Sequence, residues 1–198
     1  MSRLQPHALI TAIVYDDGAR VSPTIDRITA YLAGQGCRLA GLVQRDRQRV
    51  GRSRCDMLLE DLATGETVAI SQDRGEGARG CRLDVEALLN AVTRACRALA
   101  GEPDLLIVNK FGKTECEGGG CRPLIVAAIE HEVPVLVAVP MANLEAWRRF
   151  AGDLAVEFHL GELPADVALL CRRLGFREGA SEAPAPAASA SLVPQACT

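Results

Sequence analysis

The apolar positions of the chain predict strands that alternate with helices. Apolar runs of strand length occur at residues 8–15, 105–108 and 134–139, and further strands are expected at residues 37–44 and, more weakly, at 156–160. Such runs are typical of strands buried on both faces of a parallel sheet. Helices are expected over residues 83–99, 123–131, 143–151 and 164–174. In the first of these, one face carries Val85, Leu88, Leu89, Val92, Cys96 and Leu99. The pattern predicts an α/β fold, with a parallel sheet covered on both faces.

Two further elements follow from local signals. Ser22-Pro23 predicts a helix start, because serine is a good N-cap and proline suits the first helical position. That helix is expected to end near Gly34–Gly36. Residues 56–61 and 66–71 alternate around Ala63-Thr64-Gly65, which predicts an inserted β-hairpin.

Length and composition limit the possibilities further. The chain of 198 residues is expected to form a single domain at 1–177 and a disordered tail, rich in Ala, Pro and Ser, at 178–198. A net charge of -3 gives no support for a nucleic-acid or anionic-membrane partner. No apolar run reaches the length of a membrane span, and the start has no signal-peptide pattern. A cytoplasmic protein with reduced cysteines is therefore expected, and its oligomeric state stays open.

Ligands of an open parallel sheet bind beyond the carboxyl ends of its strands, and two loops qualify. The first, residues 16–22, lacks the lysine of the phosphate-binding pattern G-x-x-x-x-G-K-[ST]. It offers Asp16, Gly18, Arg20 and Ser22 as candidate ligand contacts. Asp16 and Asp17 would repel a polyphosphate unless a cation intervened, although the following helix start could still hold an anion. The alternative is a polar loop before a capped helix.

The second loop, residues 109–122, follows the strand at 105–108. Its glycines could form a concave nest of backbone amides, and these are Gly112, Gly118, Gly119 and Gly120. Lys110, Lys113 and Arg122 add positive charge, as does the helix start near Pro123, while Glu115 and Glu117 offset part of it. The loop would suit a small oxyanion or a phosphate group. A plain glycine-rich connection is the alternative.

The cysteines open a separate possibility. Four predicted loop thiols could bind a soft metal if the fold gathered them, and these are Cys55, Cys81, Cys116 and Cys121. The C-x4-C spacing is not that of a standard zinc ribbon, so free thiols are the alternative. Neither a Ser-His-Asp order nor an HExxH pattern is present.

The second loop also carries a family resemblance. Residues 109–115 are similar to the motif D-E-I-G-x-x-E of the small nucleoside triphosphatases related to the thermophilic and cancer-related enzymes, and the likeness covers most of residues 8–140. A closer resemblance is to a bacterial family of unknown function with N-[KR]-F-G-K-x-E-x-x-G-x-G-x-R, which residues 109–122 fulfil. That family is related to those enzymes and is often linked with molybdate uptake and molybdenum-enzyme genes.

The resemblance implies a three-layer P-loop-NTPase-like fold whose P-loop has degenerated. In the enzymes' motif a magnesium-binding Asp and a catalytic Glu stand where this chain has Asn109 and Lys110. The cofactor stays open, and these two residues argue against Mg²⁺. The leading hypothesis is a binding or regulatory protein for a small anion, either a nucleotide phosphate or an oxyanion such as molybdate. Asn109, Lys110, Lys113 and Arg122 would contact it.

Two alternatives belong to other classes of protein. A divergent nucleoside triphosphatase would hold its metal with Asp16, Asp17 and Glu115, and Glu115 would be the candidate catalytic residue. A thiol-based metal carrier would use Cys116 and Cys121.

Overall fold

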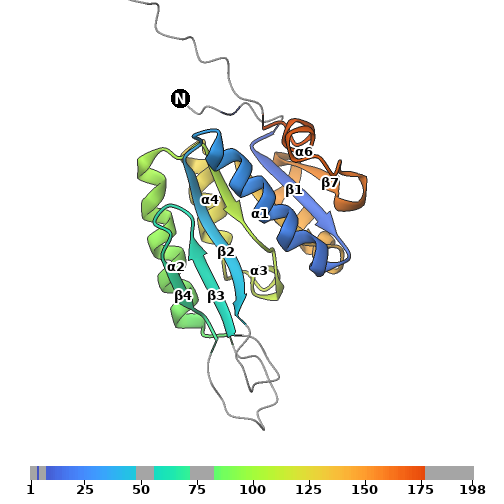
Figure 1. The fold of residues 1–198 in the computed structure, drawn as a ribbon. Coiled ribbons are helices and arrows are strands. Elements are labelled where there is room, and N and C mark those ends of the chain that lie inside the picture. The colour runs from blue at the N-terminus through green and yellow to red at the C-terminus, as the bar shows by residue number, and fades with distance from the viewer. Residues whose placement is uncertain (1–3, 5–7, 48–55, 72–82, 177–198) are drawn as a thin grey trace, which may run out of the picture.

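The described residues form one seven-stranded sheet with helices on both faces. The computed structural model describes residues 4, 8–47, 56–71 and 83–176, so the predicted tail at 178–198 lies outside the described residues. The sheet has the order β4-β3-β2-β5-β6-β1-β7 (Figure 1). Its strands are β1 (Ile10–Tyr15), β2 (Leu39–Arg47), β3 (Asp56–Asp61), β4 (Thr67–Ala69), β5 (Leu105–Val108), β6 (Val135–Pro140) and β7 (Ala155–His159).

The sheet is mostly parallel, as the sequence predicts. Strands β2, β5, β6, β1 and β7 pair in parallel, whereas β3 runs antiparallel to β2, and β4 antiparallel to β3. The predicted hairpin is therefore confirmed, and it extends the same sheet at one edge. The long apolar runs form the interior strands because those strands are covered on both faces.

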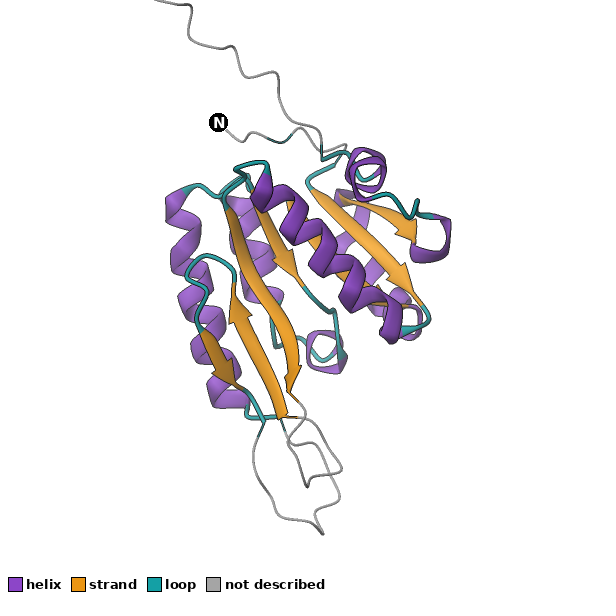
Figure 2. Cartoon of the chain, viewed as in Figure 1, coloured by secondary structure: helices purple, strands orange, loops and turns teal. Residues whose placement is uncertain are grey.

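Six α-helices lie in the described residues and make the outer layers (Figure 2). They are α1 (Gly18–Gly34), α2 (Val85–Ala98), α3 (Lys113–Cys116), α4 (Arg122–Glu130), α5 (Leu144–Ala151) and α6 (Val167–Arg173). Among the described residues, no helix is long and apolar enough to cross a membrane. The short helix α3 was not predicted, because its four residues are too few for a periodic signal.

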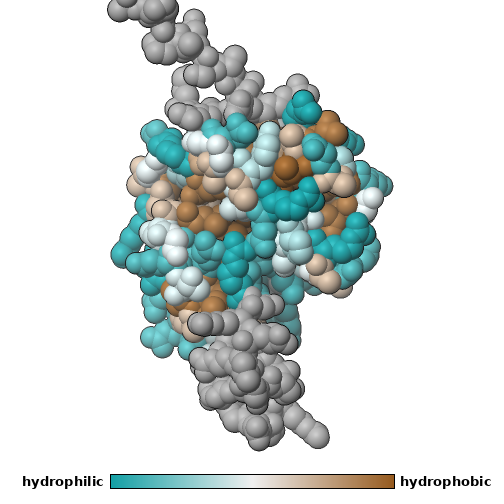
Figure 3. Space-filling model, in the orientation of Figure 1, coloured by the Kyte–Doolittle hydropathy of each residue, from teal (hydrophilic) through white to brown (hydrophobic). Residues whose placement is uncertain are grey.

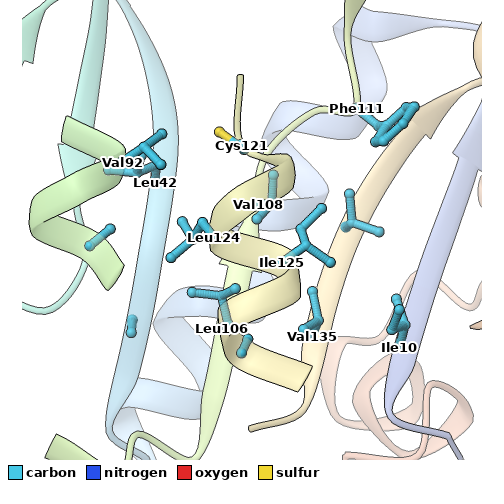
Figure 4. Close-up of a cluster of buried hydrophobic side chains, with 14 of the residues drawn as sticks. Ile10, Leu42, Val92, Leu106, Val108, Phe111, Cys121, Leu124, Ile125 and Val135 are labelled. Carbon is cyan, nitrogen blue, oxygen red and sulfur yellow. The ribbon is translucent and has the colours of Figure 1, made fainter. Parts of the chain in front are cut away.

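Two buried apolar clusters separate the layers. One joins the sheet to α2, α4 and α5, and the other joins it to α1 and α6. Strand β5 shows the division: Leu106 and Val108 belong to the first cluster, and Leu105 and Ile107 to the second. Figure 4 shows Leu106 and Val108 beside Leu124 and Ile125 of α4. On the opposite face, which carries α1, polar and apolar residues intermingle at the surface (Figure 3).

The first helix begins earlier than Ser22-Pro23 predicts, and that prediction is wrong. Helix α1 begins at Gly18, where the side chain of Asp17 accepts a 2.9 Å hydrogen bond from the amide of Ala19. Aspartate is as good an N-cap as serine, and Asp17 starts the helix five residues before the predicted position. Pro23 lies inside the helix, where its missing N–H leaves the exposed carbonyl of Ala19 to solvent.

The predicted apolar face of the helix at 83–99 is also partly wrong. Val85 and Leu89 are 54% and 50% exposed. The buried face of α2 consists of Leu88, Ala91, Val92 and Ala95, and Leu99 follows it. Alanines have small side chains that let a helix approach the sheet and the neighbouring α4 closely, so packing selects the stripe that contains them over the bulkier one.

Strand β2 leaves β5 partway along its length. It pairs with β5 only from Leu39 to Leu42, whereas its pairing with β3 runs from Leu42 to Arg47. The two strands meet closely at Gly41, whose φ is +119° and whose added Cβ would lie 2.0 Å from the carbonyl oxygen of Ile107. Beyond Val108 the hairpin of β2 and β3 continues without β5 beside it, and this opens a space at the carboxyl edge of the sheet.

This geometry predicts that Gly41→Ala destabilises the fold strongly. The new methyl group would meet the β5 backbone, which cannot rotate away, and alanine is strained at this φ. We expect the free energy of unfolding in urea to fall by about 3 kcal/mol or more. Gly34→Ala is the matched control, because its Cβ meets nothing within 4 Å. The control should stay within about 1 kcal/mol of the wild type. Equal losses in both variants would contradict the close contact at Gly41.

Candidate functional site

The segment that follows β5 is held in place by Phe111. Its ring is fully buried and lies 5.2 Å from the ring of Trp147 and 5.7 Å from that of Phe150, centroid to centroid. The amide of Phe111 donates to the carbonyl of Ala138 at 2.8 Å, and its carbonyl accepts from the side-chain amide of Asn143 at 2.8 Å. Phe111 therefore fixes the chain immediately after Asn109 and Lys110. No pattern in the sequence indicates that Asn143 would bind this segment.

Glu115 ties the two ends of the glycine-rich loop together. One carboxylate oxygen accepts a 2.8 Å hydrogen bond from the amide of Gly112, and the other accepts one of the same length from the amide of Cys121. The side chain is only 6% exposed. A carboxylate that accepts two amide hydrogen bonds inside a buried loop is a structural staple, because both of its oxygens already have partners.

The glycines allow this loop to close. Gly120 has a φ of +60°, and a Cβ there would lie 2.0 Å from a carboxylate oxygen of Glu115. The amides of Gly118 and Gly119 donate to the carbonyls of Glu115 and Thr114, at 3.1 and 2.9 Å. A ligand role for Gly118, Gly119 and Gly120 stays a prediction. The amides of Gly118 and Gly119 already donate hydrogen bonds within the loop.

A pocket of about 220 Å³ occupies the space where β2 and β5 separate. It is bounded by the β2–β3 hairpin, by α2 and by residues 109–115. Its apolar wall includes Leu42, Met57, Leu59, Leu83, Leu88 and Val108. Its polar part includes Gln44, Asn109, Lys110, Lys113, Thr114 and the hydrogen-bonded carboxylate of Glu115. The second predicted loop thus lines a real concavity at the carboxyl edge of the sheet, the position where ligands bind in such folds.

Asn109 is the unusual group in this pocket. Its side chain is 8% exposed, and its Oδ1 is fully buried without a hydrogen-bond partner among the described residues. Buried amide oxygens in native proteins are nearly always hydrogen-bonded, since an unmade bond costs about 1–3 kcal/mol. The unpartnered oxygen in this pocket wall is therefore available to a hydrogen-bond donor.

Two lysines accompany Asn109. Lys110 is exposed, and Lys113 is 88% exposed with a loose 3.6 Å ion pair to Glu117. These are the only lysines in the chain, and the other basic residues are arginines. Exposed ion pairs are weak, so both ammonium groups can be offered to an anion at the pocket.

Other predicted contacts lie elsewhere. The guanidinium of Arg122 stacks over the ring of Phe150 at 4.3 Å, and Arg122 is not among the residues that line the pocket. The connection between β1 and α1 is only Asp16-Asp17. Arg20 and Ser22 therefore lie inside α1, as does Gly18 at its first position. Strand β6 separates β1 from β5, and the described lining of the pocket includes no residue of 16–22.

The thiols of the loop are not arranged as metal ligands. Burial, followed by the charge of Glu115 and a hydrogen bond to it, raises the pKa of Cys121 far above its ordinary value. Burial also raises the pKa of Cys116, as does the neighbouring Glu115. Metals bind the thiolate, and both environments favour the thiol. Within the described residues, no group of three or more His, Cys, Asp or Glu could hold a metal, and Cys55 and Cys81 lie outside them.

The architecture defines a P-loop-NTPase-like α/β protein. A comparable solved structure is the crystal structure of THEP1 from the hyperthermophile Aquifex aeolicus, with a TM-score of 0.50. The match covers 81% of this chain and 94% of that one at 19% identity, so the likeness is one of fold. Residues 10–164 match the family described as "Protein of unknown function (DUF2478)". The chain belongs to this family.

A curated relative adds a biological context. The chain is 34% identical over 145 residues to the molybdenum import ATP-binding protein ModC 2 of Bradyrhizobium diazoefficiens. The match covers 73% of this chain but only 16% of that much longer protein. The shared part is therefore a segment of the relative, and the relative's name describes the whole protein.

The Glu115 staple predicts different effects for two neighbouring glycines. Gly120→Ala would push a methyl group into the carboxylate and strain the backbone, so the free energy of unfolding should fall by about 2–4 kcal/mol. Gly119→Ala would meet its nearest neighbour at 3.5 Å without a positive φ, and should change stability by about 1 kcal/mol or less. Urea unfolding of both variants checks this. A Gly120 variant as stable as the Gly119 variant would contradict the staple.

The pKa shift of Cys121 predicts its reactivity. A raised pKa lowers the thiolate fraction at any given pH, and burial blocks access as well. We expect alkylation of Cys121 by iodoacetamide in the native protein to stay slow from pH 7 to pH 10, and to become fast in urea. Mass spectrometry of the labelled peptides measures both rates. Rapid native labelling at pH 8 would show an accessible thiolate and revive the metal-carrier alternative.

Proposed function

We propose that the protein binds a small anionic ligand in the pocket at the carboxyl edge of β5, and that it acts as a binding or regulatory protein. The ligand is a nucleotide phosphate or an oxyanion such as molybdate. Lys110 and Lys113 supply the positive charge, and Asn109 supplies a buried polar contact. The interior of the cell is the setting we propose for it.

The two lysines at the pocket are the observation that carries the proposal. They have no strong ion pair among the described residues, and the unpartnered oxygen of Asn109 beside them offers an acceptor to a ligand that also carries a donor. A ligand that donates a hydrogen bond to Asn109 and places its anion near Lys110 and Lys113 would pair with all three side chains. Lysine acts on phosphate as a point charge, which suits an opening where the anion is not held in one orientation.

The comparisons support both kinds of ligand. The fold is that of nucleotide-binding proteins, and the relative is named for molybdenum import and ATP binding. Because the shared segment is 16% of that relative, its name does not say which activity the segment carries. Nucleotides and molybdate are therefore both used as probes in the same experiment.

Metal-dependent hydrolysis has less support from the geometry. The Asp17 side chain caps α1, and both oxygens of Glu115 accept amide hydrogen bonds. A magnesium site made from Asp16, Asp17 and Glu115 would compete with these bonds, and its ligands would come from two strands that β6 separates. The start of α1 also occupies the positions that the eight-residue phosphate-binding pattern would need, which fits a degenerate Walker motif.

Calorimetry of the full chain tests the proposal with ATP, GTP, inorganic phosphate, molybdate and tungstate. At least one of these should bind, and the affinity should weaken with added salt. The double variant Lys110→Ala/Lys113→Ala should lose about tenfold or more, because it removes the charges at the pocket.

The matched control is Arg94→Ala/Arg97→Ala, which removes two charges from exposed positions of α2 and should bind like the wild type. Absence of heat with all five probes would overturn the proposal. So would an equal loss of affinity in the lysine pair and in the arginine pair.

A further inference from the structure

We infer that the ligand is a flat nitrogen heterocycle joined to an anionic group, as in a nucleoside monophosphate, and that its ring lies in the β2–β3 side of the pocket. This inference rests on the proposed function, because the same lysines receive the anion. It differs from that proposal in excluding a bare inorganic oxyanion as the fitted ligand, and in assigning the apolar wall to a ring.

The wall opposite the lysines cannot serve an oxyanion. Leu42, Leu59 and Val108 offer only hydrocarbon, and these residues are 2%, 7% and 1% exposed. An oxyanion buried there would lose its hydration without gaining donors, which is costly. A ring would instead cover the partly exposed apolar side chains of the same wall, Met57 and Leu83, and gain about 25 cal/mol for each Å² of apolar area removed from water.

The side chain of Asn109 favours a ring that carries a hydrogen-bond donor. Its buried Oδ1 accepts a hydrogen bond and would repel an oxyanion that carries no proton. A ring N–H or an exocyclic amino group would supply the missing donor. A carboxamide also carries an N–H donor beside its acceptor oxygen. It can therefore form two hydrogen bonds with a ring edge that presents a donor and an acceptor, as asparagine does with adenine.

The size of the pocket limits the ligand. About 220 Å³ is smaller than the roughly 300–1,000 Å³ of sites for drug-sized molecules. One ring system can be enclosed, and the remainder of the ligand must reach the opening, where Lys110 and Lys113 are exposed. Met57 gives the wall an adaptable side chain that can pack against a ring face. A single phosphate on a short arm fits this arrangement better than a triphosphate.

The origin of the pocket supports the same division. Strand β5 stops at Val108 while the β2–β3 hairpin continues, so the edge of β2 beyond Leu42 is left without β5 beside it. Asn109 marks the point of separation, since its amide still donates to the carbonyl of Leu42 at 3.2 Å. The apolar wall and the polar group therefore come from one feature of the sheet, and they face the same space.

Titration calorimetry of the full chain tests this with three sets of probes. These are AMP, GMP, CMP and UMP; the four corresponding nucleosides; and inorganic phosphate and molybdate. We expect at least one nucleotide to bind ten or more times tighter than inorganic phosphate, and its nucleoside to retain measurable binding. Because Lys110 and Lys113 are the only side-chain amines, the same nucleotide should slow their acetylation, as read by mass spectrometry of the wild type.

The variant Asn109→Leu separates recognition from folding. It should weaken the nucleotide about tenfold and weaken inorganic phosphate clearly less, because it removes the contact to the ring. It should not lower the free energy of unfolding, since it replaces an unpartnered buried oxygen with an apolar side chain. Asn90→Leu, at an exposed position of α2, is the matched control and should change neither affinity.

The outcomes distinguish the two proposals. If inorganic phosphate or molybdate binds as tightly as every nucleotide and no nucleoside binds, the ring assignment is overturned and the anion site stands. If nucleosides bind but phosphate groups add nothing, the anion site is overturned and the ring assignment stands. If no probe binds and acetylation is unaffected by all of them, both are overturned.

Discussion

The glycine-rich loop, and with it the pocket, depends on the two hydrogen bonds that the Glu115 carboxylate accepts from the amides of Gly112 and Cys121. These bonds join the end of the β5 segment to the start of α4. Gly120 has no side chain because the carboxylate occupies that space. On the opposite side, Phe111 packs against Trp147 and Phe150. Held from both sides, the short segment that contains Asn109 and Lys110 has little freedom, which favours a preorganised binding surface.

Much of the fold could be predicted from the sequence. The apolar runs have the length and continuity of strands covered on both faces, so the alternating order of strands and helices followed from them. The hairpin followed from the alternation of residues 56–61 and 66–71 around a turn. The first residue of α1 could not be predicted, because Asp17 and Ser22 are both good N-caps and the local sequence does not favour one over the other. The buried face of α2 was equally ambiguous: Val85 and Leu89 fit the helical period, and only the close approach of sheet and helix favours Ala91 and Ala95.

The site was predictable in position more than in detail. The motif at 109–122 pointed to the carboxyl edge of β5, and Asn109, Lys110 and Lys113 do line a pocket there. The other half of the pocket comes from β2, β3 and α2, far away in the sequence. No spacing rule could have joined Met57 and Leu88 to Asn109, since their meeting depends on where β2 leaves β5. Glu115 was predicted to be a catalytic or ligand-binding residue, because the backbone amides that it binds instead leave no signature in the sequence.

The two-residue connection between β1 and α1 has a consequence for any attempt to engineer a phosphate-binding loop into this chain. The eight-residue pattern would need positions that α1 now occupies, so the first turn of the helix would have to unwind or residues would have to be inserted. Unwinding would release the cap that Asp17 provides, and the design would therefore need a new N-cap further along the helix.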